Sequence, residues 1–260
     1  MPDHYGYAGN VLKIDLCSRT VSEYPWNRED REKNLGGKIM AAQILRDHLT
    51  GNETAYSEDN WVVISTGPLT GTGAPGSSRF DIAALSPKDD LPAFSNCGGD
   101  FGIWLKKAGY DALILTGRSE ENCWLEIQED SIAFHDAKEL WGTGTECCQK
   151  KLETLLGTDR FGRLVIGPAG ENLVKFASVV SGSHSAGRAG MGAVLGWKNL
   201  KAITVSGNKK IPLSDPEAAA RWNQKWYADL RAFAAGKENR GKAVCPSCPL
   251  HCSKHSHSDE

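Results

Sequence analysis

Three cysteines near the end of the sequence have a spacing that suits metal binding. They are Cys245, Cys248 and Cys252 in the segment Cys-Pro-Ser-Cys-Pro-Leu-His-Cys, which gives the pattern C-x2-C-x3-C. A C-x2-C loop brings two thiolates to one centre, and the third cysteine adds a further ligand. Iron–sulfur clusters are usually held by such closely spaced cysteines together with one remote cysteine.

A zinc site is the alternative for the same segment. Zinc could bind the three cysteines and one nearby histidine, His255 or His251. Zinc sites usually separate two ligand pairs by roughly a dozen residues, whereas all candidates crowd together here, which favours the cluster. The cluster still needs a fourth ligand, which could be His251, His255, His257 or a residue outside this chain. A cysteine-rich tail without metal is the third interpretation.

Three glycine-rich segments could bind phosphate. They cover residues 67–79, 95–102 and 182–192, and each combines glycines with hydroxyl or arginine side chains. Glycine lets the backbone approach a ligand closely, and exposed N–H groups can bind phosphate oxygens. Arg79 and Arg188 would each add a forked cationic group. None of the segments is a Walker A loop, and ordinary turns are the alternative interpretation.

Composition and charge exclude several classes of protein. The chain has 260 residues, with 30 Lys and Arg against 32 Asp and Glu, so it lacks the broad basic field that non-specific nucleic-acid binding requires. No apolar stretch approaches the roughly 20 residues of a membrane span, and the N-terminus has no signal-peptide pattern. We therefore expect a cytoplasmic protein. Because that compartment is reducing, we expect no disulfide framework.

The predicted strands and helices that would position these residues occur in the same order in two parts of the sequence. Each part is predicted to contain a strand hairpin, a helix, a buried strand, a Gly-Pro loop and another strand. The first set is predicted at residues 9–16, 21–25, 38–49, 61–65 and 80–85, and the second at 124–128, 132–135, 146–156, 164–166 and 176–180. This internal repeat predicts a duplicated α+β domain, with chance similarity of short motifs as the alternative.

A helix and the cysteine-rich segment follow the duplicated part. Residues 209–215 form a linker, and residues 217–235 are predicted to form one helix with Trp222, Trp226 and Leu230 at every fourth position. We therefore predict an α+β fold of two similar halves, followed by a C-terminal helix and the cysteines.

The chain resembles the tungsten- or molybdenum-containing aldehyde ferredoxin oxidoreductase family. The resemblance runs from the start of the chain to the cysteine segment. It is carried by Gly6-Tyr-Ala-Gly9, Leu35-Gly-Gly37, Thr66-Gly-Pro-Leu-Thr-Gly71, Ala108-Gly-Tyr-Asp111, Ile166-Gly-Pro-Ala-Gly-Glu-Asn172, Ala186-Gly-Arg188 and Lys198-Asn-Leu-Lys-Ala-Ile203. It implies that residues 1–208 form the N-terminal domain, which is the base for a bis-pterin tungsten or molybdenum cofactor.

The resemblance also implies which residues contact the cofactors. Some members of the family have arginine and alanine where His184 and Ser185 stand, so this sequence departs from their pattern there. Magnesium is expected to bridge the pterin phosphates, and the three cysteines match ligands of a 4Fe-4S cluster. The expected pterin contacts are Arg79, Asn96, Gly98, His184, Ser185 and Gly187.

Family members carry their fourth cluster cysteine and their substrate pocket in helical domains downstream of this segment. Residues 209–260 would therefore be a linker helix and the start of a truncated cluster-binding domain, completed by a second polypeptide. The implied reaction is oxidation of an aldehyde to a carboxylate, with ferredoxin as the electron acceptor. The alternatives are a non-catalytic iron–sulfur subunit for electron transfer or assembly, and a zinc-binding structural remnant of a truncated gene.

Overall fold

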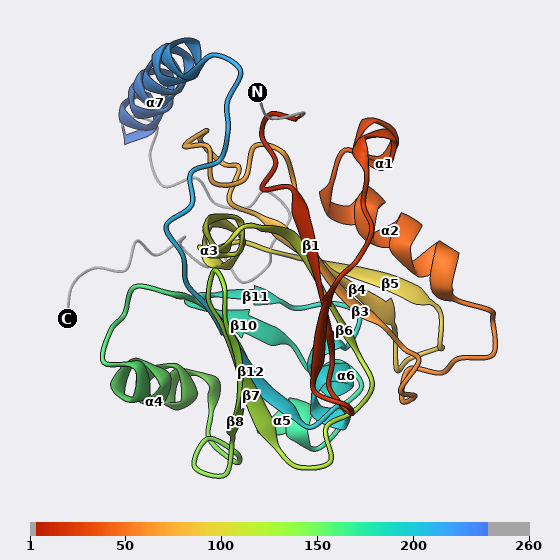
Figure 1. Cartoon of the computed structure of the whole chain (residues 1–260). Helices are drawn as coiled ribbons and strands as arrows, with labels where there is room; N and C mark the ends of the chain where they lie inside the picture. The colour runs from red at the N-terminus through yellow and green to blue at the C-terminus, as the bar shows by residue number, and fades with distance from the viewer. Residues whose placement is uncertain (1–3, 239–260) are drawn as a thin grey trace, which may run out of the picture. The chain divides into compact units, whose positions relative to one another are not determined.

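A computed structural model describes residues 4–238, with side chains described up to residue 232. The chain divides into two compact units, Met1–Ser214 and Asp215–Glu260. The first unit contains two six-stranded sheets. Figure 1 shows the strands of both sheets in the middle of this unit.

The two sheets have the same strand order. The first contains β1 (Asn10–Asp15), β2 (Thr20–Glu23), β3 (Val62–Thr66), β4 (Phe80–Leu85), β5 (Pro92–Cys97) and β6 (Tyr110–Thr116), arranged β2-β1-β6-β3-β4-β5. The second contains β7 (Cys123–Ile127), β8 (Ile132–Asp136), β9 (Gly162–Ile166), β10 (Val179–Ser181), β11 (His184–Ala186) and β12 (Leu200–Val205), arranged β8-β7-β12-β9-β10-β11. In each sheet the first and last strands of the half, β1 with β6 and β7 with β12, pair in parallel. The predicted duplication is therefore confirmed.

The helices also recur between the halves. Helices α2 (Gly37–His48) and α4 (Thr145–Leu156) follow the first hairpin of each half, and α3 (Phe101–Ala108) and α6 (Met191–Trp197) precede its last strand. Helices α1 (Arg28–Asn34) and α5 (Pro168–Glu171) have no counterpart in the other half. In Figure 1, α2 and α4 lie on opposite outer sides of the unit.

The main core lies between the sheets and contains residues of both. Ile14, Ile64 and Leu113 of the first sheet belong to the same buried cluster as Leu125 and Ile203 of the second. Alternate residues of the first sheet point the other way and pack under α2. Because the central strands are buried on both faces, they appear in the sequence as continuous apolar runs.

Each half has a β-bulge at the start of its last strand. The pairing of β6 with β1 jumps from Tyr110 to Ala112 and leaves out Asp111. The pairing of β12 with β7 jumps from Leu200 to Ala202 and leaves out Lys201. The two halves therefore place a buried charged residue at equivalent bulge positions, with opposite sign.

Both bulge residues form buried ion pairs. Lys106 Nζ donates to Asp111 Oδ1 over 2.6 Å, and the N–H of Ala8 donates to the same oxygen over 2.9 Å. Lys201 Nζ pairs with the carboxylate of Glu171 and donates to the carbonyl of Thr143 over 2.9 Å. The hydrogen bonds with the backbone of Ala8 and Thr143 therefore connect segments that are remote in the sequence to the last strand of each half.

The structure corrects two parts of the sequence-based assignment. Two of the three glycine-rich segments are partly strand, because residues 95–97 lie in β5 and residues 184–186 form β11. The strand predicted at 176–180 begins only at Val179, and Phe176, which was assigned to it, is 81% exposed. Strands β5 and β11 lie at the edges of their sheets and pair on one side only, so they need no apolar alternation and their composition resembles that of loops.

The second unit contains helix α7 (Pro216–Glu238), close to the predicted helix. Asp215 caps its first turn, because Asp215 Oδ1 accepts a hydrogen bond of 2.8 Å from the N–H of Ala218. The side chains of Trp222, Trp226 and Leu230 are exposed. Among the described residues, no helix has both the length and the apolar character needed to cross a membrane.

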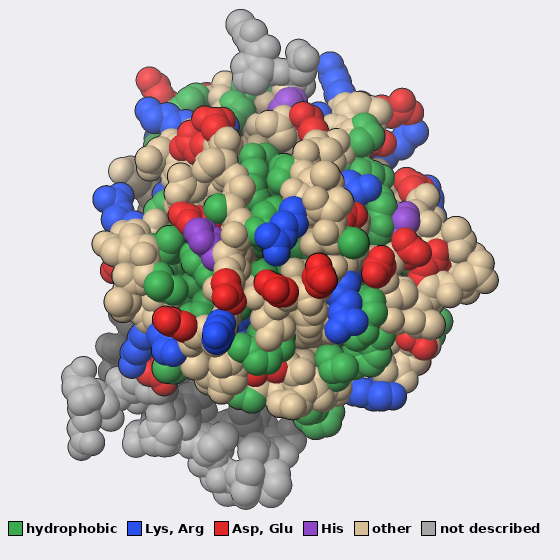
Figure 2. Space-filling model, turned by 60° about the horizontal axis from the view of Figure 1, so that its bottom comes forward, with side chains coloured by type: hydrophobic (Ala, Val, Ile, Leu, Met, Phe, Trp, Pro, Cys, Tyr) green, Lys and Arg blue, Asp and Glu red, His purple; other side chains and the backbone are tan. Residues whose placement is uncertain are grey.

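The surface of the molecule carries charges of both signs. Figure 2 shows acidic and basic side chains interspersed on one face, with apolar side chains between them. This distribution agrees with the formal net charge of −2.

Lys198 is a third buried lysine, and it caps helix α6. Its Nζ donates to the carbonyl of Gly117 over 2.7 Å. Burial lowers the pKa of Lys198 to about 8, although the carboxylates of Glu58, Asp15 and Asp59 oppose this shift.

We predict that the free energy of unfolding rises with pH between about 8 and 10, because the unfolded chain holds a proton on Lys198 that the folded chain has lost. One such proton changes the slope by up to about 1.4 kcal/mol per pH unit. Urea unfolding of wild type and Lys198→Met at pH 7.5–9.5 tests this, with the exposed Lys209→Met as control. Parallel pH profiles for wild type and Lys198→Met would contradict the prediction.

Glycines allow α5 and α6 to approach closely. A Cβ on Gly196 would overlap the carbonyl oxygen of Gly170. We predict that Gly196→Ala lowers the free energy of unfolding by about 1–3 kcal/mol, the usual cost of overpacking. Gly144→Ala is the matched control, because nothing lies within 4 Å of its Cβ position, and it should change stability by less than about 0.5 kcal/mol. Equal urea midpoints for the two variants would refute the steric argument.

Candidate functional site

The edge strands β5 and β11 of the two sheets meet, and the predicted site residues lie where they meet. A Cβ on Gly98, just after β5, would lie 2.8 Å from Cδ2 of His184 in β11, so the imidazole rests directly on this glycine. The N–H of Arg188 donates to Ser95 Oγ over 3.1 Å, across 93 positions of sequence. The structure therefore brings the glycine-rich segments of both halves into one place.

Arg79 and Asn96 form the part of the site that belongs to the first half. Arg79 directly precedes β4, and its Nη1 donates to Asn96 Oδ1 over 2.5 Å. Asn96 Nδ2 in turn donates to the carbonyl of Phe80 over 3.2 Å, which fixes the amide on the edge strand. Both side chains are exposed. Because a guanidinium has five N–H donors, Arg79 keeps donors for another acceptor.

The segment before Arg79 folds on itself around Thr70. Thr70 Oγ1 accepts from the N–H of Gly67 over 3.3 Å and lies 3.0 Å from the carbonyl oxygen of Ser77. It also lies 3.4 Å from the carbonyl oxygen of Arg79. This buried hydroxyl therefore orders the first glycine-rich segment and the backbone that carries Arg79.

Two acidic groups lie beneath the exposed side chains. Burial raises the pKa of the Cys97 thiol to about 11, although the guanidinium of Arg79 opposes the shift. Burial also raises the pKa of Asp81, while hydrogen bonding from Asn96 and the charge of Lys38 lower it. Cys97 is therefore neutral at physiological pH, and the thiolate form that binds metals is not populated.

The backbone at Gly98 and Gly99 forms the floor of the site. Gly99 has φ +90°, and its Cβ position would be 3.3 Å from both the carbonyl oxygen and the hydroxyl of Ser181. Ser181 Oγ is buried and has no hydrogen-bond partner among the described residues. At Gly187 a Cβ would only make ordinary contacts of 3.5 Å or more. A Cβ at Gly98 would displace the His184 ring, and the left-handed backbone favours glycine at Gly99, whereas Gly187 has room for a Cβ.

The donors gathered here suit an anionic ligand rich in oxygen. They are the guanidinium of Arg79, the amide of Asn96, the ring of His184 and the hydroxyl of Ser185, all of them exposed. Charged and neutral N–H and O–H donors of this kind bind phosphate and similar anions. The residues present therefore fit a cofactor with phosphate groups, and the orphaned hydroxyl of Ser181 is one more polar group at the site.

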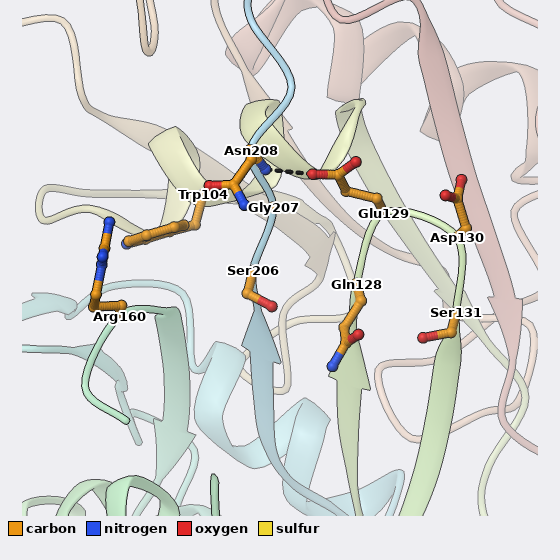
Figure 3. Close-up of a pocket in the computed structure, with 9 residues that line it drawn as sticks. All are labelled: Trp104, Gln128, Glu129, Asp130, Ser131, Arg160, Ser206, Gly207 and Asn208. Carbon is orange, nitrogen blue, oxygen red and sulfur yellow. Dashed lines mark hydrogen bonds between the residues drawn. The ribbon is translucent and has the colours of Figure 1, made fainter. Parts of the chain in front are cut away.

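A separate hollow of about 470 Å³ lies between the β7–β8 turn and α3 (Figure 3). Trp104 and Arg160 form one side, and Glu129 and Asp130 lie in the turn opposite them. The backbone N–H of Asn208 donates to the carboxylate of Glu129. None of the six predicted site residues lines this hollow, and its two carboxylates would repel an anionic cofactor.

The predicted metal ligands Cys245, Cys248 and Cys252 lie outside the described residues. Within the part of the chain that is described, no group of three or more His, Cys, Asp or Glu side chains could hold a metal ion.

Several residues at the site were not predicted from the sequence. Ser95, Ser181 and Thr70 each hold the backbone of a glycine-rich segment or contact one. All three are isolated hydroxyl residues, and no local pattern distinguishes them from serines and threonines elsewhere. Ser95 and Ser181 are revealed by contacts across the two halves, and Thr70 by its contacts with Ser77 and Arg79.

Comparison with known proteins connects this fold to one family. Residues 11–207 match the family described as aldehyde ferredoxin oxidoreductase, N-terminal domain. The tungsten-containing aldehyde ferredoxin oxidoreductase of Thermococcus kodakarensis is 37% identical over 214 residues, which are 82% of this chain and 35% of that protein. The aliphatic sulfonate oxidoreductase, WOR-like subunit, of Pyrococcus furiosus is 33% identical over 252 residues, 90% of this chain and 40% of that protein.

A solved structure is also similar to this chain in fold and in sequence. It is the active site complex BamBC of benzoyl coenzyme A reductase with 1,5 dienoyl-CoA, which has a TM-score of 0.81 and 33% identity, and the match covers 94% of this chain and 36% of that one. The chain thus spans little more than a third of these larger proteins. By sequence and by fold, it belongs to the aldehyde ferredoxin oxidoreductase family and carries the N-terminal domain.

Proposed function

We propose that this chain is the cofactor-binding N-terminal part of an oxidoreductase that converts aldehydes to carboxylates with ferredoxin as electron acceptor. The observation that carries the proposal is the meeting of β5 with β11. Gly98 of one half lies against His184 of the other, and Arg79 is hydrogen-bonded to Asn96 on the edge strand that Gly98 follows. We propose that these residues bind the cofactor together with Ser185 and Gly187. The proposed cofactor is a bis-pterin complex of tungsten or molybdenum, held on residues 1–208.

Each residue has a role that its chemistry supports. The guanidinium of Arg79, oriented by Asn96, would neutralise an anionic cofactor and donate two parallel hydrogen bonds. The backbone at Gly98 would allow close approach of the pterin. His184 and Ser185 would donate to phosphate oxygens, and a magnesium ion bridging these phosphates would accept amide and carbonyl oxygens as ligands.

The reaction takes an aldehyde and water to a carboxylic acid, two protons and two electrons. When bound, the metal–pterin group supplies the capacity to accept two electrons. Cys245, Cys248 and Cys252 would bind three irons of a 4Fe-4S cluster, which passes electrons on to ferredoxin. The part of each relative that this chain matches is 35–40% of the relative's length. We propose that helical domains complete the site and that residues 209–260 begin the cluster-binding part.

We predict that Arg79→Gln reduces the tungsten or molybdenum and the pterin retained by anaerobically purified protein. A hydrogen bond to a charged group contributes about 1.5–3 kcal/mol, so the loss of retained cofactor should be severalfold or larger. Metal is measured by mass spectrometry and pterin by fluorescence. The control is Arg160→Gln, which removes an exposed arginine from the hollow in Figure 3. Equal cofactor content in the two variants would rule out the role of Arg79.

We predict that the same preparation contains iron, and that Cys248→Ala removes it. The paramagnetic signal of the reduced cluster should disappear with the iron, because a cluster needs all of its thiolate ligands. Cys147→Ala, an exposed cysteine on α4, serves as control and should retain the iron. One zinc per chain, lost in Cys248→Ala, would instead support the zinc alternative.

A further inference from the structure

We propose that Gln149 of helix α4 is a positioning residue that holds the β10–β11 hairpin against the floor of the cofactor site. This inference rests on the proposed function. Gln149 Oε1 accepts from the N–H of Gly182 over 2.8 Å, and Gln149 Nε2 donates to the carbonyl of the same residue over 3.2 Å. Gln149 is only 9% exposed, so its amide is largely shielded from competing water.

The two hydrogen bonds fix both the position and the orientation of one peptide segment. Gly182 and Ser183 form the turn between β10 and β11, since Ser181 pairs with His184 across it. Gly182 has φ +59°, in the left-handed region that glycine adopts at least cost. A carboxamide that bonds the N–H and the C=O of this residue therefore determines where the turn lies.

The residues on either side of the turn contact the floor of the site. The Ser181 carbonyl oxygen and hydroxyl would be 3.3 Å from a Cβ on Gly99, and the His184 ring would be 2.8 Å from a Cβ on Gly98. A displacement of the turn must therefore move His184 and Ser185 relative to the backbone of Gly98. Gln149 itself acts only through these residues.

The hairpin is held at its far end by Val179 and Ala186, which belong to the main core. Its turn end has less support, because each strand contains only three residues and β11 pairs within its sheet with β10 alone among the described strands. Helix α4 contributes Cys148 and Leu152 to an apolar cluster on the outer side of the second sheet. This packing holds the helix in place, and the hydrogen bonds of Gln149 connect the turn to the helix.

The test uses two substitutions at Gln149. Gln149→Met keeps the side-chain length and removes both hydrogen bonds. In Gln149→Glu at neutral pH, one carboxylate oxygen can accept from the Gly182 N–H. The other carboxylate oxygen repels the carbonyl oxygen of Gly182, because both are negative. Protonation of the glutamate restores the missing donor, so acid should rescue this variant and not the methionine variant.

The first measurement is amide hydrogen exchange of the full chain at residues 181–188. We expect exchange about tenfold faster or more in Gln149→Met than in wild type, because the turn loses two hydrogen bonds. Thr154→Ala is the matched control, since Thr154 Oγ1 donates only to the carbonyl of Lys150 within the same helix. Unchanged exchange in Gln149→Met would overturn the proposal.

The second measurement is the tungsten or molybdenum retained after dialysis of anaerobically purified protein at pH 7 and pH 5. We expect Gln149→Met to lose metal at both pH values. Gln149→Glu should lose it at pH 7 and regain wild-type retention at pH 5. Wild type and Gln149→Met at each pH correct for effects of pH that do not involve residue 149.

The outcomes separate the two proposals. If wild type contains metal and Gln149→Met retains it as well as Thr154→Ala does, the role of Gln149 is overturned and the proposed function is left intact. Faster exchange at residues 181–188 with unchanged metal retention also overturns it, because Gln149 would then be merely structural. A wild-type protein with neither metal nor pterin overturns the proposed function, and the cofactor role of Gln149 with it.

Discussion

Two buried ion pairs, Lys106 with Asp111 and Lys201 with Glu171, lie at the β-bulge that begins the last strand of each half. Asp111 also accepts from the backbone N–H groups of Ala8 and Gly9. Removing one member of such a pair leaves a buried charge and typically costs about 3–5 kcal/mol. Since β6 and β12 each lie between two neighbours of their sheets, both sheets depend on these anchors.

The equivalence of the two bulges explains why the two halves share the order of their strands and helices but few identical residues. Asp111 and Lys201 occupy the same place and carry opposite charges, so the bulge geometry is common to both halves while the residue is not. Apolar runs such as β3 and β9 could be predicted from the sequence, because burial on both faces imposes a composition that does not depend on particular residues.

The strands that build the site are those that the sequence predicts least well. Strands β5 and β11 expose Asn96, His184 and Ser185, so they lack the alternation that reveals a half-buried strand. Both strands and the residues next to them are also rich in glycine and in hydroxyl residues, which are typical of turns. Of the six predicted site residues, the glycine-rich segments indicated Arg79, and the family resemblance was needed for the rest. The contacts of Thr70 with the backbone of the first glycine-rich segment could not be predicted from a local pattern.

Both halves fix their edge hairpins with a buried carboxamide. Asn60 Oδ1 accepts from the N–H of Leu85, and its Nδ2 lies 3.2 Å from the carbonyl oxygen of that residue, at the end of β4. Gln149 makes the same pair of bonds to Gly182, directly after β10. The two amides come from different elements, so the duplication alone does not explain them. An edge strand has only one neighbouring strand. A site formed by two edge strands therefore needs contacts from other elements that fix the position of each strand.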